Sequence, residues 1–113
     1  MPSKIERCAI YIRVSTAEQM MHGKSLEAQK QYLTNYAKEH NMTVAGVYAD
    51  EGKTARKELK KRKAIHSLLE DVKAGKIDVI IFWRIDRWFR NLSDFYKVQE
   101  VLDDNNVRWI STR

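Results

Sequence analysis

The sequence predicts an α/β fold: a central, mainly parallel sheet of about four strands flanked by helices. Segments with strand character alternate with segments of helical periodicity along the whole chain, which is typical of parallel α/β sheets. The run Val79–Trp83 is apolar without interruption, as expected for a strand that is covered on both faces. An all-antiparallel sheet would contradict this prediction.

Four segments have the length and composition of strands: Cys8–Val14, Thr43–Ala49, Ile77–Trp83 and Val107–Ile110. Successive side chains of a strand point to opposite faces of the sheet. The first strand is therefore expected to place one set of side chains on one face, namely Tyr11, Arg13 and Ser15. The other face is expected to hold Ile10, Ile12 and Val14.

Three helices are expected between these strands. The first follows Ser25, a residue type favoured as an N-cap, and its core-facing side is expected to include Leu26, Leu33, Tyr36, Ala37 and His40. The second carries Ile65, Leu68, Leu69 and Val72 at helical spacing and stops at Gly75, a typical C′ residue. The third carries Phe95, Val98, Val101 and Leu102 and ends at Asn105-Asn106.

The composition is that of one folded domain. The chain has 113 residues, of which 43% are hydrophobic and 32% are charged. Its single cysteine, Cys8, excludes an internal disulfide and is expected to be buried and inert within the first strand. A reducing, cytoplasmic location is the natural expectation.

The chain has 21 basic and 15 acidic residues, which give it a formal net charge of +6. The excess is concentrated between residues 53 and 63, in Lys53, Arg56, Lys57, Lys60, Lys61, Arg62 and Lys63. Such a run is either an ordinary solvated surface or a surface that contacts the phosphates of a nucleic acid. Composition alone leaves both interpretations open.

Several classes of site are disfavoured. His22, His40 and His66 do not fall at metal-ligand spacings, and one cysteine provides no zinc set. The four glycines are scattered and form no phosphate-binding loop, which argues against a nucleotide enzyme. No metal or other cofactor is expected.

Arginines stand at the ends of two predicted strands. Arg13 lies beside Ser15 at the end of the first, while Asp86, Arg87 and Arg90 follow the third. Sites of parallel sheets form outside the carboxyl ends of the strands. A guanidinium suits phosphate oxygens and a serine hydroxyl is a possible nucleophile. The alternative for the first strand is a solvated arginine followed by a serine that caps a loop or helix.

Five motifs occur in order along the chain. They are Tyr-x-Arg-Val-Ser-Thr at 11–16, Ser-Leu-Glu-Ala-Gln at 25–29, Asp-Glu-Gly at 50–52, Lys-Ala-Gly-Lys-Ile-Asp-Val at 73–79 and Asp-Arg-x-x-Arg-Asn at 86–91. In these motifs the chain resembles the serine site-specific recombinases, a family of resolvases, invertases and large phage-type integrases. The spacing is most similar to that of the large integrases. The resemblance departs at Thr54-Ala55, where relatives usually have Ser-Gly, and at Lys63, where they usually have proline.

The resemblance implies that Ser15 is the nucleophile that cleaves and rejoins DNA through a 5′-phosphoserine intermediate. It assigns stabilisation of the phosphate to four arginines, Arg13, Arg62, Arg87 and Arg90. Asp86 either orients a guanidinium or takes part in proton transfer; orientation is favoured, because arginines nearby lower the pKa of a carboxylate. Tyr11 and Gln29 are expected to support the site.

The resemblance also implies partners. Double-stranded DNA is the expected substrate, contacted in part by Lys53, Arg56, Lys57, Lys60 and Lys61. The full-length protein is expected to form a dimer, and a tetramer in the synaptic complex. Residues 1–113 are expected to be the catalytic domain, truncated before a dimerisation helix and a DNA-binding region.

Two other interpretations remain. A non-catalytic DNA-binding or regulatory remnant would keep the same fold, although it would have no need of an intact Ser15 and its arginines. An unrelated flavodoxin-like domain would explain the alternation of elements but not the arginines at two strand ends. Finding Ser15 on the opposite edge of the sheet from Arg87 and Arg90 would refute the enzymatic interpretation.

Overall fold

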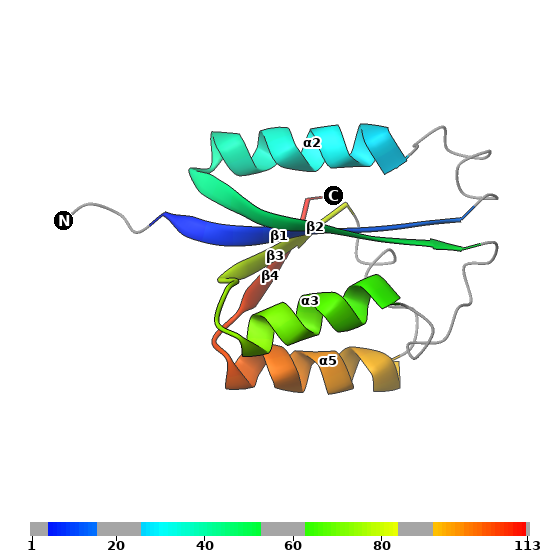
Figure 1. Ribbon diagram of the computed structural model, residues 1–113, viewed down its shortest axis with the longest axis vertical. Coiled ribbons are helices and arrows are strands. Elements are labelled where there is room, and N and C mark those ends of the chain that lie inside the picture. Colours follow the sequence, from blue (N-terminus) through cyan, green and yellow to red (C-terminus); the bar gives the residue numbers. More distant parts are fainter. Residues whose placement is uncertain (1–4, 16–25, 53–62, 84–91, 113) are drawn as a thin grey trace.

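A four-stranded sheet lies between one helix on one face and two helices on the other (Figure 1). The computed structural model describes residues 5–15, 26–52, 63–83 and 92–112. The elements in chain order are β1 (Glu6–Ser15), α2 (Leu26–Glu39), β2 (Met42–Gly52), α3 (Lys63–Lys73), β3 (Val79–Phe82), α5 (Leu92–Asp104) and β4 (Arg108–Ser111). Helix α2 covers one face, and α3 and α5 cover the other (Figure 1). The predicted parallel α/β sheet with helices on both sides is confirmed.

The strands are arranged in the order β2-β1-β3-β4, and each neighbouring pair is parallel. Because all strands point the same way, their carboxyl ends lie at one edge of the sheet, the carboxyl edge, and their amino ends lie at the opposite amino edge. β1 and β2 are the longest strands and extend beyond the others at the carboxyl edge (Figure 1).

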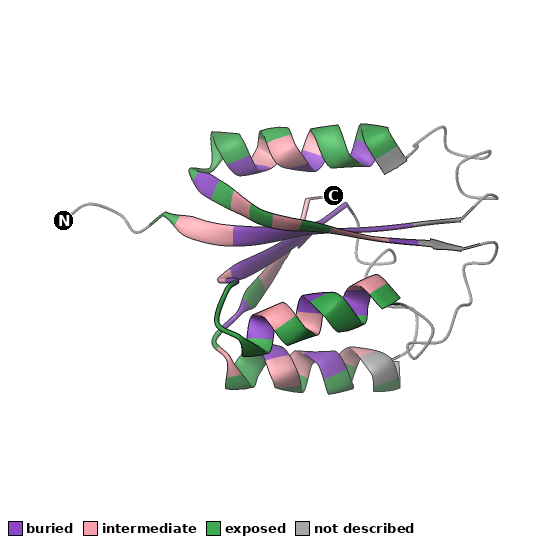
Figure 2. Cartoon of the chain, in the orientation of Figure 1, coloured by how far each residue is buried: buried purple, intermediate pink, exposed green. Residues whose placement is uncertain are grey.

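Each face of the sheet has its own apolar core. The core beneath α2 contains Cys8, Ile10, Ile12, Leu33, Ala37, Met42, Val79 and Ile81. The core beneath α3 and α5 contains Ala9, Tyr11, Ile65, Leu68, Val72, Ile77, Ile80, Phe82, Val98, Leu102 and Val107. All four residues of β3 are buried, and Figure 2 shows burial continuing along the middle of the sheet. The predicted alternation is confirmed from Cys8 to Ile12, and the doubly covered third strand is confirmed as well; the side chains of Val14 and Ser15 lie outside the described ones.

The predicted ends of the second and third helices are confirmed by backbone geometry. Gly75 has a φ of 76° just after α3, and Asn106 has a φ of 57° just after α5. Both lie in the left-handed region, where glycine and asparagine are the favoured residues after a helix. The predicted N-cap of the first helix, Ser25, lies outside the described residues.

Several details differ from the prediction, including the bounds of the first strand, Glu6–Ser15 instead of Cys8–Val14, and of the fourth, Arg108–Ser111 instead of Val107–Ile110. His40 is exposed and not part of the core, because α2 ends at Glu39 and the His40 ring stacks outside on Tyr36, with 4.0 Å between ring centroids. The second strand continues to Gly52 instead of ending at Ala49, since β1 provides a partner for each added residue. The third strand begins at Val79 instead of Ile77. The carboxylate of Asp78, just before it, accepts a hydrogen bond from the backbone N–H of Arg7.

Cys8 is fully buried, and burial raises the pKa of its thiol, as expected for an inert cysteine. Within the described part of the chain, no helix combines the length and the apolar character needed to cross a membrane.

Helix α3 is tied to β2 by a hydrogen bond from the Tyr48 phenol to Asp71. The Tyr48 ring lies over Gly46, where an added Cβ would come within 2.8 Å of the phenol oxygen. Partial burial, followed by the hydrogen bond to the Asp71 carboxylate, raises the pKa of Tyr48 to about 12. A phenolate at this position would be desolvated and would face a carboxylate.

We expect Tyr48→Phe to lower the free energy of unfolding by about 1 kcal/mol at pH 7, since one hydrogen bond to a half-exposed carboxylate is removed. The unfolded phenol titrates near pH 10, below the folded value of about 12. The contribution of Tyr48 is therefore fully present below about pH 10 and falls as the pH rises from 10 to 12. Urea unfolding of both proteins at pH 7, 9 and 11 measures this. A difference between the two proteins that grows above pH 10 would contradict the prediction.

Candidate active site

The connections that leave β1 and β3 at their carboxyl ends go to opposite faces of the sheet. β1 leads to α2 on one face, and β3 leads to α5 on the other (Figure 1). Open parallel sheets bind their ligands at such a position, where the strand order reverses. The two arginine-bearing segments predicted to form the site are the end of β1 and residues 84–91, which follow β3 in the chain. β1 and β3 thus end at a common edge, while residues 84–91 themselves lie outside the described residues.

Three polar or charged side chains are buried in the described part of the chain: Arg13, Gln29 and Asp50, which are 7%, 2% and 7% exposed. Arg13 is near the end of β1, Asp50 is near the end of β2, and Gln29 is in the first turn of α2. All three therefore lie toward the carboxyl edge. Burying a charged group is costly unless the protein compensates for it, so this concentration marks the edge as the candidate site.

Arg13 and Asp50 are directly paired in the parallel register of β1 and β2. The pairs Tyr11–Tyr48 and Ile12–Ala49 precede them without interruption, and Tyr11 and Tyr48 both pack on the side of α3. Arg13 and Asp50 therefore belong to that same face. Gln29 approaches from the other face, because α2 covers the opposite side of the sheet (Figure 1).

Asp50 is a further candidate site residue, which its motif alone did not single out. Its Oδ2 accepts a hydrogen bond from the Tyr11 phenol at 2.7 Å and one from the backbone N–H of Ile65 at 3.2 Å. Its Oδ1 accepts the backbone N–H of Ala64 at 2.9 Å. The carboxylate thus joins β1, β2 and the first turn of α3. The Asp-Glu-Gly motif was recognised, but only the register shows which way its aspartate faces.

Ser15 is the last residue of β1 and is paired with Gly52. By register, Tyr11 is level with Phe82 of β3, so β1 continues for roughly 13 Å past the end of that strand. The predicted nucleophile is therefore on the part of β1 that extends beyond β3, on the same strand as Arg13 and toward the carboxyl edge.

The end of β3 is fixed by contacts to its neighbours. The Thr112 hydroxyl donates to the carbonyls of Phe82 and Trp83, each at 3.2 Å. The Trp83 ring packs against the Tyr32 ring of α2 in a T-shaped arrangement, with 4.6 Å between ring centroids. Trp83, the last described residue before Asp86, is thus held by Thr112 and by α2.

The other predicted site residues lie outside the described residues. They are Arg62, Asp86, Arg87 and Arg90 of the proposed catalytic set, and Lys53, Arg56, Lys57, Lys60 and Lys61 of the proposed DNA-binding set. Arg62 directly precedes α3 in the sequence, and the structure brings Tyr11, Arg13 and Asp50 together beside the start of that helix.

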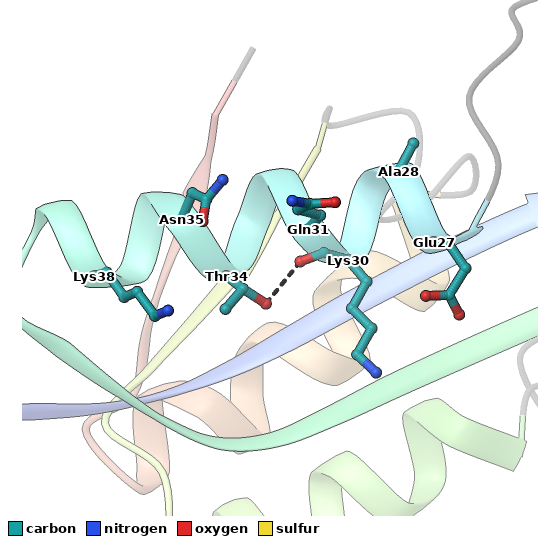
Figure 3. A pocket seen from close by; sticks show the side chains of 7 residues that line it. All are labelled: Glu27, Ala28, Lys30, Gln31, Thr34, Asn35 and Lys38. Carbon is teal, nitrogen blue, oxygen red and sulfur yellow. Dashed lines mark hydrogen bonds between the residues drawn. The ribbon is translucent and has the colours of Figure 1, made fainter.

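The outer surface of α2 carries a shallow hollow of about 370 Å³ that is not a second active site (Figure 3). Its lining comes from one helix: Glu27, Ala28, Lys30, Gln31, Thr34, Asn35 and Lys38. The Thr34 hydroxyl donates a hydrogen bond to the Lys30 carbonyl at 2.7 Å. The side chains in Figure 3 spread along the helix instead of converging on a common point, which is the arrangement of a solvated helix face.

Comparison with known proteins identifies the class of this α/β domain. Residues 8–113 match the family model described as "Resolvase, N terminal domain". The chain belongs to this family, the resolvase-type serine site-specific recombinases. A protein of Bacillus subtilis (strain 168) named "Putative DNA recombinase" is 34% identical over 99 residues, which are 88% of this chain and 19% of that protein.

Solved structures agree with this assignment. The N-terminal catalytic domain of TP901-1 integrase superposes with a TM-score of 0.80 and 33% identity, covering 94% of this chain and 77% of that one. The catalytic domain of ISC1926 TnpA, an IS607-like serine recombinase, gives 0.79 and 29%, covering 95% and 67%. A resolvase family site-specific recombinase from Streptococcus pneumoniae gives 0.75 and 31%, covering 96% and 72%. The chain thus spans most of each solved domain but about a fifth of its Bacillus relative.

Proposed function

We propose that this chain cleaves and rejoins DNA, with Ser15 attacking a phosphodiester to form a 5′-phosphoserine link and release a 3′-hydroxyl. The observation that carries the proposal is that Arg13 is buried. It lies on the same strand as Ser15 and opposite Asp50 of β2 in the sheet register. This position is at the carboxyl edge, where such sheets bind their ligands. A guanidinium placed there can stabilise the negative charge that develops on the phosphate oxygens.

The reaction exchanges one phosphoester for another. The Ser15 oxygen forms a bond to phosphorus while the bond to the 3′ oxygen breaks, and the proton given up by the hydroxyl balances the proton taken up by the leaving oxygen. Rejoining is the reverse attack by a 3′-hydroxyl, so no ATP is consumed. Negative charge spreads over the phosphate oxygens in the transition state, and positioned cations lower the barrier.

Arginines take the role of those cations in this proposal. Arg13 is joined by Arg62, Arg87 and Arg90, and Asp86 orients a guanidinium. Gln29 and Tyr11 support the site from opposite faces of the sheet, Tyr11 through its hydrogen bond to Asp50. The family resemblance implies that this chemistry proceeds without a metal ion.

Double-stranded DNA is the proposed substrate, and the active form is proposed to be a dimer that pairs into a tetramer during synapsis. The natural protein would act in the cytoplasm, where DNA is accessible. Integration, excision and inversion share the same cleavage chemistry and differ in the DNA sites that are joined.

The test is to mix the natural full-length protein with DNA that carries its recombination site and to stop the reaction with denaturant. We expect DNA attached to Ser15 through a 5′ phosphate, identified by peptide mapping. A protein that binds this DNA but never forms the link would instead be the non-catalytic remnant considered above.

A separate prediction concerns DNA affinity. We expect the 113-residue chain to bind DNA weakly, without sequence preference, and with an affinity that falls steeply with salt, because its contacts are made to phosphates. Fluorescence anisotropy between 50 and 200 mM salt, on two unrelated duplexes, measures this. Salt-independent affinity, or tight selection of one duplex, would refute the prediction.

The same assay locates the residues that bind phosphate. Changing Lys53, Lys57, Lys60 and Lys61 to glutamine should make the slope of log affinity against log salt shallower by about 0.9 for each phosphate that is no longer neutralised. The matched control is Lys38→Gln with Lys73→Gln. Both control lysines are exposed in the last turns of α2 and α3, which lie toward the amino edge, so the slope should not change.

A further inference from the structure

The end of β3 is held by the residue that directly follows β4. β4 is the outermost strand beside β3, and the last pair in their register is Phe82–Ser111 (Figure 1). The next residue, Thr112, donates its backbone N–H to the Phe82 carbonyl at 3.0 Å. Its hydroxyl donates to the carbonyls of Phe82 and Trp83, each at 3.2 Å. Thr112 therefore holds the chain at the point where it leaves β3.

The hydroxyl of Thr112 extends the contact between the two strands by one residue. The backbone N–H of Thr112 is used by Phe82, and β4 itself ends at Ser111. The Trp83 carbonyl, one residue beyond β3, accepts its hydrogen bond from the side chain instead. Threonine is branched at Cβ and has a restricted χ1 angle, which limits where its hydroxyl can lie. The donor is therefore held in place as well as present.

The side chain of Trp83 is anchored on the α2 face of the sheet. Val79 and Ile81 of β3 belong to the core beneath α2, so the alternation of the strand also turns Trp83 to that side. There Trp83 is 9% exposed, and its ring packs against Tyr32 of α2. Tyr32 follows the buried Gln29 by three residues on the same helix. The backbone of Trp83 is thus held from β4 and its ring from α2.

This anchor lies close in sequence to a cation of the proposed mechanism. Arg87 is four residues beyond Trp83, a length of chain that spans at most about 14 Å. The direction in which the chain leaves Trp83 therefore affects where this guanidinium can be placed. A displacement of about 1 Å at a reacting group can cost about 10²-fold in rate. Arg13 does not depend on this anchor, because it lies within β1 and is placed by the pairing of β1 with β2.

We propose that Thr112 is a positioning residue of the reaction: its hydroxyl fixes the direction in which the chain leaves β3 toward Arg87. This inference rests on the proposed function, and it adds a residue that acts through another instead of touching the DNA. The role belongs to the hydroxyl, because the backbone bond from Thr112 to Phe82 does not require any particular side chain.

The test compares Thr112→Val with Thr112→Ser in the natural full-length protein. Valine keeps the branched shape and the backbone N–H but removes the donor, whereas serine keeps the donor. The matched control is Thr34→Val. It removes a hydroxyl that also donates to a backbone carbonyl, that of Lys30, on the outer surface of α2 (Figure 3). Thermal unfolding gives a temperature at which all variants are folded, and single-turnover formation of the covalent link is measured there.

We expect Thr112→Val to slow formation of the covalent link by roughly 10-fold, because Arg87 is less well placed for the transition state. DNA affinity should not change, since the contacts to phosphates remain. Thr112→Ser should restore most of the rate, and Thr34→Val should react at the wild-type rate.

A double-mutant cycle separates positioning from a general decrease in stability. In a protein that already carries Arg87→Ala, Thr112→Val should slow the reaction by a further factor of roughly 2 or less, because the group that it positions is gone. In a protein that carries Arg13→Ala, the same substitution should cost the full factor of roughly 10. Equal factors in the two backgrounds would overturn the proposal, since Thr112 would then not act through Arg87.

The outcomes distinguish this inference from the proposed function. If the wild-type protein forms no covalent link, the proposed function fails and the role of Thr112 fails with it. If the wild type forms the link and Thr112→Val does so at the same rate, only the role of Thr112 is overturned. The same conclusion follows if Thr112→Ser is as slow as Thr112→Val, or if Thr34→Val is equally slow, since the hydroxyl of Thr112 would then not be responsible.

Discussion

Replacing Ser15 by alanine is expected to abolish the covalent protein–DNA link while leaving DNA affinity nearly unchanged. The attacking oxygen is removed, and no other residue of the chain matches its position in the family motif. Affinity is expected to persist because it comes mainly from contacts between basic residues and phosphates. Denaturing electrophoresis of end-labelled DNA measures the link, and anisotropy measures the binding.

The matched control is Ser67→Ala, which removes an exposed hydroxyl from α3. This variant should form the link at the wild-type rate. Undiminished cleavage by the Ser15→Ala protein would exclude Ser15 as the nucleophile. Absence of DNA binding by the same variant, with its fold intact, would show that Ser15 contributes to affinity and would contradict the separation of binding from chemistry.

The second large effect is expected from Arg13→Ala, which should slow cleavage by roughly 10²-fold or more. The nucleophile remains, but a cation at the carboxyl edge is removed. Arg13 is buried, and a sodium ion from the solvent has no N–H groups with which to replace its guanidinium. Arg13→Lys should also be slow, since an ammonium is a point charge that cannot present the planar fork of a guanidinium to phosphate oxygens. Single-turnover rates at saturating protein give the comparison.

Added guanidinium ion provides a sharper control for this prediction. At low millimolar concentrations it should partly restore cleavage by Arg13→Ala, because the truncated side chain leaves space for it, whereas sodium chloride at equal ionic strength should not. Arg7→Ala is the matched arginine variant, since Arg7 pairs with Asp78 at the amino edge. A wild-type rate for Arg13→Ala, or equal slowing by Arg7→Ala, would contradict the assignment.

The charged side chains at the two edges of the sheet differ in how far they are buried. At the amino edge, Arg7 pairs with Asp78 and Arg108 pairs with Glu6, and the four side chains are between 21% and 55% exposed. Such pairs contribute little to stability and serve to align strands. At the carboxyl edge, Arg13 and Asp50 are buried. A charge is rarely buried for stability alone, because desolvation offsets the attraction, and this contrast favours a functional role for the carboxyl edge.

Local sequence information predicted most of the fold. Some features can be recognised without the tertiary structure, because they depend on neighbouring residues or on one buried face. They are the apolar run of β3, the alternation along β1, and the glycine and asparagine after α3 and α5. His40 was placed wrongly because periodicity alone does not show that α2 ends one residue earlier.

The candidate site was predicted in part. The sequence indicated Arg13 and Tyr11 because a strand places alternate residues on one face; the structure shows that Arg13 is buried and that the Tyr11 phenol donates a hydrogen bond to Asp50. The roles of Ser15, Arg62, Asp86, Arg87 and Arg90 came from the family motifs and remain predictions that the proposed experiments test.

The class of fold, the strand that carries Ser15 and Arg13, and the family can all be recognised from the amino-acid sequence. The position of Asp50 opposite Arg13 and at the start of α3 follows from the tertiary structure. That position depends on Ala45, an extra residue in β2 between the partners of Cys8 and Ala9, which reverses the faces of β2 midway along the strand. A bulge of this kind is set by how β2 pairs with β1 and by the two cores on either side of it, so no local pattern in β2 reveals it.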